Sequence, residues 1–196
     1  MSIACTTIFF HTDAEDLIAR YEANTEKPCA YLTRVNECWV FVDALATETA
    51  DWARQLELAT VMTEDEVIGL SVFIVGEHWA IGLTYDGRLG PVAAYLPDDA
   101  TQMRLLPQRL LSIEKALDDL FPDQADPERI DAFFGAVLEG ALSIDEAMTE
   151  ILGLLGCPGD WLRWSWFETV PDQLFIDPDI TDRVVPVGET RHFWEE

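Results

Sequence analysis

Histidine and cysteine are the side chains here that could perform acid–base or nucleophilic chemistry near neutral pH. Cys5, His11 and Asp13 lie close together in the sequence and supply the residue types of a Cys/His/Asp site. Such a site needs the thiol within hydrogen-bonding distance of the imidazole, whereas six residues of an extended strand span about 20 Å. Cys5 therefore cannot reach His11 within one strand, and we expect His11 and Asp13 to form a turn and a helix cap.

The other two histidines offer no catalytic arrangement either. His78 follows Gly76 and Glu77, where a tight turn is expected, so its ring should be exposed to solvent. His192 lies near the end of the sequence and has no recognisable partner.

Acidic side chains could bind a cation or act as a paired acid and base. Asp177, Asp179 and Asp182 have a spacing that faintly resembles the start of a calcium loop, but the central Gly and the Glu at the twelfth position are missing. The 37 acidic residues supply many possible carboxylate pairs, and the sequence fixes no distance between them. We therefore assign no catalytic residue, no metal ligand and no cofactor.

The four cysteines, Cys5, Cys29, Cys38 and Cys157, are scattered and form no C-x-x-C pair, so zinc-ligand spacing is absent. Cys29 and Cys38 belong to one expected hairpin, but a two-residue turn would leave them out of register. We expect four half-buried thiols and no disulfide.

Charge is the dominant feature of the composition. The chain has 37 acidic and 12 basic residues, a net charge of −25, and 49% apolar residues. Such apolar content indicates a folded protein with an anionic surface rather than a disordered acidic chain. The charge is spread over both halves, with −11 in residues 1–98 and −14 in residues 99–196. No cluster of basic residues is present, which argues against direct contact with nucleic acid or with an anionic membrane.

Length and segment composition limit the class of protein. The first ten residues lack the basic start of a signal peptide, and no run approaches the roughly 18 apolar residues of a membrane helix. We expect a cytoplasmic protein. The 196 residues are consistent with a single α+β domain, with a possible subdivision into a sheet-rich part, 1–97, and a helical part, 98–196.

Hydrophobic patterns in the first half predict an antiparallel or mixed sheet with two helices. The helices are expected over 13–22 and 47–61. The predicted strands cover residues 3–10, 30–35, 38–43, 67–75, 79–85 and 92–96.

The second half predicts three helices with clear end signals. The first covers 107–121, and the second begins at Pro127 after an Asp126 cap. The third opens with the capping box of Ser143 and Glu146. Two further segments are expected, an aromatic strand over 161–170 and a loop-like tail over 171–196.

Three tryptophans stand close together in the expected aromatic strand. Trp161, Trp164 and Trp166 could pack in the core between sheet and helices. They could also form a partly exposed patch with Glu168 and Asp172 as an acidic rim, the usual composition of a protein-binding surface. Both interpretations stay open.

The charge favours a non-catalytic acidic binding protein that docks a basic partner protein, as acidic inhibitors and immunity proteins do. An anionic body attracts a cationic surface and accelerates encounter. One alternative is an enzyme or small-ligand protein whose acidic surface only reflects salt adaptation or solubility. Another is a subunit of a larger assembly. The sequence identifies neither the partner nor the oligomeric state.

Overall fold

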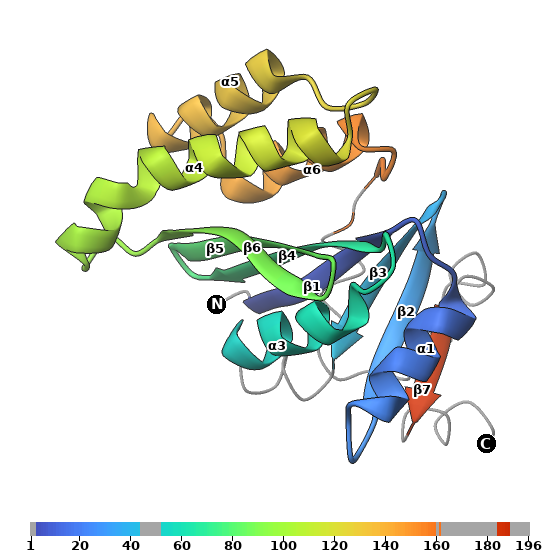
Figure 1. Cartoon of the computed structure of the whole chain (residues 1–196). Helices are drawn as coiled ribbons and strands as arrows, with labels where there is room; N and C mark the ends of the chain where they lie inside the picture. The colour runs from blue at the N-terminus through green and yellow to red at the C-terminus, as the bar shows by residue number, and fades with distance from the viewer. Residues whose placement is uncertain (1–2, 44–51, 160, 162–183, 189–196) are drawn as a thin grey trace.

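The computed structural model describes residues 3–43, 52–159, 161 and 184–188. In this part of the chain, seven antiparallel strands form one sheet with helices on both faces, which confirms the α+β class (Figure 1). The strands are β1 Ile3–Phe10, β2 Cys29–Val35, β3 Cys38–Asp43, β4 Ile68–Val75, β5 His78–Tyr85, β6 Arg88–Tyr95 and β7 Val184–Gly188. The helices are α1 Ala14–Ala23, α3 Trp52–Met62, α4 Ala100–Leu120, α5 Pro127–Leu138 and α6 Ile144–Leu154.

The sheet has the strand order β6-β5-β4-β1-β3-β2-β7. Two-residue turns join β2 to β3, β4 to β5 and β5 to β6, with left-handed φ values of 53° at Asn36, 60° at Gly76 and 52° at Asp86. Glycine and asparagine adopt this conformation most readily, and aspartate follows them. The turn at Asn36 places Val35 opposite Cys38, which is the register that the sequence predicts.

The central strands bury both of their faces. Ile8 and Phe10 of β1 pack into the cluster under α4, α5 and α6, whereas the intervening Phe9 packs into the cluster against α1 and α3. Alternate side chains of a strand point to opposite faces, so a sheet with helices on both sides needs apolar residues at successive positions. This requirement explains why β4 is almost entirely apolar, with Ser71 as its polar residue and with Leu70 and Val72 buried.

Helix α4 begins at Ala100, seven residues before the Pro107 start that the sequence predicts. The Asp99 side chain caps the helix by accepting hydrogen bonds from the amides of Thr101 and Gln102, at 2.9 and 3.0 Å. Proline has no amide hydrogen, so inside a helix it removes one backbone hydrogen bond. In the first turn of a helix that hydrogen would have no partner, and this is why Pro107 resembles a helix start in the sequence. The cap at Asp99 and the length of the helix outweigh that local cost.

The predicted starts of α1, α5 and α6 agree with the structure, whereas the predicted start of α3 at residue 47 lies outside the described residues. Asp13 and Asp126 cap α1 and α5, and Ser143 with Glu146 forms the capping box of α6. Helix α3 is described from Trp52 onward.

The edge strands differ from the sequence prediction. β6 begins at Arg88, before the predicted start at Val92, because an edge strand tolerates Pro91, whose missing amide need not face a neighbour. The tail over 171–196, predicted to be loop-like, contains β7, which pairs with β2. Val184 and Val187 of β7 are buried against the sheet. The predicted strand over 161–170 lies outside the described residues except for Trp161, which is helical rather than extended, so the prediction is wrong at this residue.

The pairing of β7 with β2 can be tested at Gly188. This residue has a φ of 65°, and a Cβ there would collide with the backbone carbonyl of Pro28. We expect Gly188→Ala to lower stability by about 2 kcal/mol, a fall of about 4–8 °C in Tm. The control is Gly153→Ala in α6, where a Cβ meets nothing within 4 Å. That change should raise stability by about 0.5–1 kcal/mol. Equal thermal melting of the Gly188 variant and the wild type would contradict the β7 pairing.

Candidate functional site

The residues of the considered Cys/His/Asp site lie apart. The Cys5 thiol contacts the side chain of Gln55 on α3, in the interior. The His11 ring stacks on Phe121, with 5.8 Å between the centroids. Asp13 accepts a hydrogen bond from the Asp16 amide at 2.9 Å, so its predicted capping role is confirmed.

His78 lies on the surface, as the sequence predicts. Its Nε2 is 4.0 Å from a carboxylate oxygen of Asp98, and both side chains are largely exposed. A surface contact of this length contributes little to stability. His192 lies outside the described residues.

In the described part of the chain, no group of three or more His, Cys, Asp or Glu side chains is arranged to hold a metal ion. Asp177, Asp179 and Asp182 lie outside it. None of the described helices combines the length and hydropathy required to cross a bilayer.

Of the three tryptophans of the predicted patch, Trp161 lies within the described residues. Trp161 is 1% exposed, and its Nε1 donates a hydrogen bond to Thr149 Oγ1 at 3.2 Å. The residue therefore packs in the core below the helices, as the first of the two interpretations requires. Trp164, Trp166, Glu168 and Asp172 lie outside the described residues, and their role in partner binding stays a prediction.

A buried carboxylate joins three elements on the opposite face of the sheet. Asp43, at the end of β3, is 2% exposed and accepts hydrogen bonds from the Tyr21 hydroxyl at 3.0 Å and from Arg54 Nη2 at 3.1 Å. The Tyr21 oxygen in turn accepts from the amide of Cys29 at 3.0 Å. Burial, followed by the Asp43 charge, raises the pKa of Tyr21, so the hydroxyl stays a donor. The network fixes α1 and α3 against the sheet. Sequence pattern alone does not reveal it, because its members are far apart in the chain.

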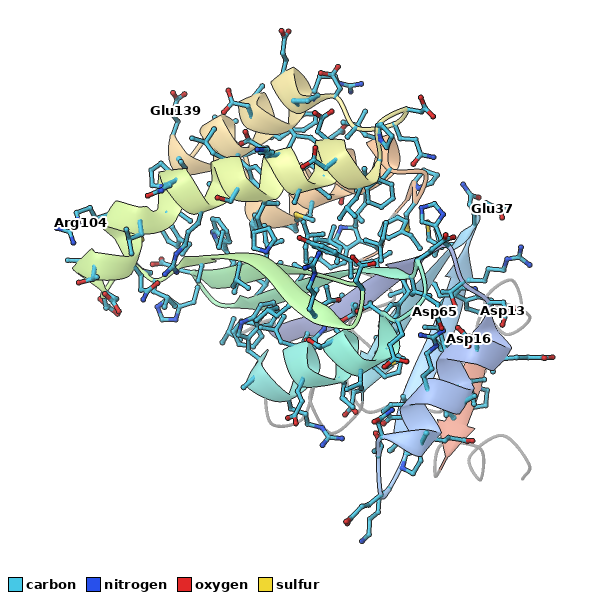
Figure 2. All side chains as sticks on the ribbon, in the orientation of Figure 1. Asp13, Asp16, Glu37, Asp65, Arg104 and Glu139 are labelled. Atoms are coloured by element: carbon cyan, nitrogen blue, oxygen red, sulfur yellow. The ribbon has the colours of Figure 1, made fainter. Side chains whose placement is uncertain are left out.

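Carboxylates beside α1 are partly neutralised by arginine. Arg20 Nε lies 2.9 Å from Asp16, and its Nη2 lies 3.4 Å from Asp65. Figure 2 shows Asp13, Asp16 and Asp65 close together next to α1. The negative charge on this face is therefore reduced by ion pairs within the protein.

The three-helix layer differs in this respect. We call α4, α5, α6 and their connections, residues 98–159, the helical layer. It has 13 acidic and four basic side chains, a net charge of −9. Among the described residues, no carboxylate of this layer lies within 4.0 Å of an arginine or lysine nitrogen. Ion pairs among the described residues therefore do not compensate its charge.

Folding explains only some of these acids. Asp99, Asp126 and Glu146 are used as helix caps. The segment 118–128, around the connection from α4 to α5, has five acids and no base. Glu139, at the end of α5, projects away from the sheet (Figure 2). The remaining exposed acids of the layer are Asp98, Asp118, Asp119, Asp123, Glu128, Asp131 and Glu150.

Exposed apolar residues lie among these charges. Leu111 on α4 is 57% exposed and Leu138 on α5 is 42% exposed. They are two of the three large apolar side chains exposed in the described chain, the third being Leu89 of β6. Leu111 shares a face of α4 with Lys115 and Asp118, four and seven residues later. Apolar contacts within a charged rim are typical of protein-binding surfaces.

One acid of the helical layer is buried. Glu114 of α4 is 7% exposed, and burial raises the pKa of its carboxyl, with the Asp131 carboxylate on α5 adding to the shift. The carboxylate of Asp131 therefore lies near enough to Glu114 to disfavour its charged form. Neither the burial of Glu114 nor its neighbour can be read from the sequence, which shows only a charged helix.

Comparison with known proteins adds no function, since no protein-family model, curated protein or solved structure matches the chain. The surface described above is therefore the basis for inferring a function.

The raised pKa of Glu114 predicts a pH-dependent cost. Because the folded chain binds this proton more tightly than the unfolded chain, stability falls as pH rises above the ordinary glutamate value of 4.5. Glu114→Gln removes the charge that destabilises the folded state at pH 7, so we expect this variant to melt at a higher temperature than the wild type. Each kcal/mol of stability regained should raise Tm by about 2–4 °C, and the rise should become smaller toward pH 4, where Glu114 is protonated in the wild type. Glu128→Gln, on the exposed surface of α5, removes the same charge and should change Tm less. Thermal melting of Glu114→Gln at or below the wild-type Tm at pH 7 would show that Glu114 carries no such cost.

The Asp43 network predicts a structural role for this carboxylate. Asp43→Asn removes the charge that Arg54 and Tyr21 contact, and we expect a loss of about 2–4 kcal/mol in urea unfolding. The control is Asp65→Asn, which alters an exposed ion pair with Arg20 and should stay within about 0.5 kcal/mol of wild type. Similar losses in the two variants would be inconsistent with a special role for Asp43.

Proposed function

We propose that this chain is a non-catalytic binding protein that docks a basic partner protein on its helical layer. One observation carries the proposal: the carboxylates of this layer lack ion pairs with arginine or lysine among the described residues, and the same layer exposes Leu111 and Leu138. Leu111 and Leu138 supply apolar contact area, and the acids supply long-range attraction.

Electrostatics supports this choice of face. An arginine that pairs with a carboxylate cancels much of its field, as Arg20 does beside α1, whereas unpaired carboxylates add their fields over several ångströms. A cationic surface would be attracted to the helical layer before contact, and the rate of association would rise at low ionic strength. Charge of one sign also disfavours acidic partners.

Capture from the lysate of the source cells tests the proposal with two matched variants. The first neutralises four acids of the helical layer as Asp118→Asn, Asp119→Asn, Asp123→Asn and Glu128→Gln. The second makes the same change of charge on other elements, as Glu15→Gln, Glu26→Gln, Glu57→Gln and Glu64→Gln. At about 50 mM NaCl, the wild type and the second variant should retain a basic protein, identified by mass spectrometry, that the first variant loses.

The identified protein is then measured by surface plasmon resonance. We expect the first variant to bind at least about tenfold more weakly, mainly through a lower association rate. Leu111→Ser keeps the charge and should raise the dissociation rate. Equal binding by both neutralised variants, or retention at about 500 mM NaCl without loss, would contradict docking through the acidic helical layer.

A further inference from the structure

Two cysteines that are far apart in the sequence meet in the interior of the protein. Cys38 is the first residue of β3, directly after the β2–β3 turn. Cys157 follows the end of α6, where its amide donates to the Leu152 carbonyl at 2.8 Å. Both belong to the hydrophobic cluster between the sheet and the helical layer, with exposed fractions of 2% and 0%.

The two thiols are direct neighbours. A hydrogen bond joins the Cys38 side chain to that of Cys157. Cys5 lies on the other face of the sheet and contacts Gln55. Cys29 is partly exposed on β2, and its amide bonds to Tyr21. The fold therefore pairs Cys38 with Cys157 and keeps both of them separate from the other two thiols.

We propose that Cys38 and Cys157 are a disulfide-forming pair, a modification site that links the sheet covalently to the helical layer. The oxidant is a low-molecular-weight disulfide. The thiolate of one cysteine attacks a sulfur of this reagent, breaks its S–S bond and releases one thiolate. The second cysteine then attacks the protein sulfur of the mixed disulfide and releases the other thiolate. The two protons of the protein thiols pass to the two released thiolates, so one disulfide is reduced as another forms.

The environment of the pair makes the reaction slow while the protein stays closed. The hydrogen bond with Cys157, followed by burial, raises the pKa of the Cys38 thiol, and a thiol reacts far more slowly than a thiolate. Neither sulfur is open to a reagent of glutathione size. Oxidation therefore requires local opening between the end of α6 and the start of β3, and its rate reports that opening.

The link would change stability more than shape. It closes a loop of more than 100 residues, and long loops lose the most entropy in the unfolded chain when they are cross-linked. The hydrogen bond between the two side chains places the sulfurs next to each other before oxidation. We expect oxidation to raise Tm by about 10 °C and a reductant to reverse the rise. This inference does not depend on the docking of a basic partner.

The test uses the reduced full-length chain incubated with oxidised glutathione. Intact mass should fall by two hydrogen atoms, and peptide mapping without reductant should recover the segments of Cys38 and Cys157 joined together. Cys29→Ala should behave as the wild type does, whereas Cys38→Ala and Cys157→Ala should not form the link. Thermal melting before and after dithiothreitol measures the shift in Tm.

The wild-type map alone can overturn the proposal, even where the alanine variants fold poorly. A link that includes Cys5 or Cys29 would overturn it, as would glutathione retained on Cys38 or Cys157 as a mixed disulfide. So would a chain whose four thiols all remain reduced under conditions that oxidise it when unfolded in urea. An unchanged Tm in the linked protein would show that the bond does not tie the two layers together.

Discussion

The need to cover both faces of the central strands shapes this protein. Over residues 5–10 of β1 and 68–72 of β4, successive residues are uncharged and buried, so neither face of the sheet can be left to water there. The helical layer covers one face, and α1 with α3 covers the other (Figure 1). Most of the described acids therefore lie on the outer surface, and the two buried ones are exceptions: Asp43 is hydrogen-bonded, and burial raises the pKa of Glu114.

Local signals in the sequence predict most of the elements. Turn residues at Asn36 and Asp86 mark hairpins, and caps at Asp13, Asp126 and Ser143 mark helix starts. The errors arise where tertiary context outweighs a local signal. The cap of α4 at Asp99 overrides Pro107, and β7 forms in a proline-containing tail because β2 offers an unpaired edge. Which face each helix covers is a long-range property that periodicity does not encode.

The candidate site was less predictable than the fold. Net charge indicates an anionic surface, but it does not show which carboxylates form ion pairs with arginine. Those ion pairs join residues such as Arg20 and Asp65, which are 45 residues apart in the sequence. The sequence indicated the three tryptophans as candidates for partner binding, but Trp161 lies in the core. The exposed leucines of α4 and α5 gave no signal, because Leu111 and Leu138 resemble ordinary members of apolar helices.

The position of β1 has a consequence for how the chain acquires its structure. This strand lies in the middle of the sheet, between β3 and β4, yet it precedes both of them in the sequence. During synthesis it leaves the ribosome without either neighbour, because its partners on β4 lie 58 to 72 residues further along the chain, from Phe10↔Ile68 to Ile3↔Val75. Contacts of such wide sequence separation slow folding and leave an apolar strand exposed to other chains in the meantime. The nascent protein therefore passes through a stage in which its most central segment is also its least protected.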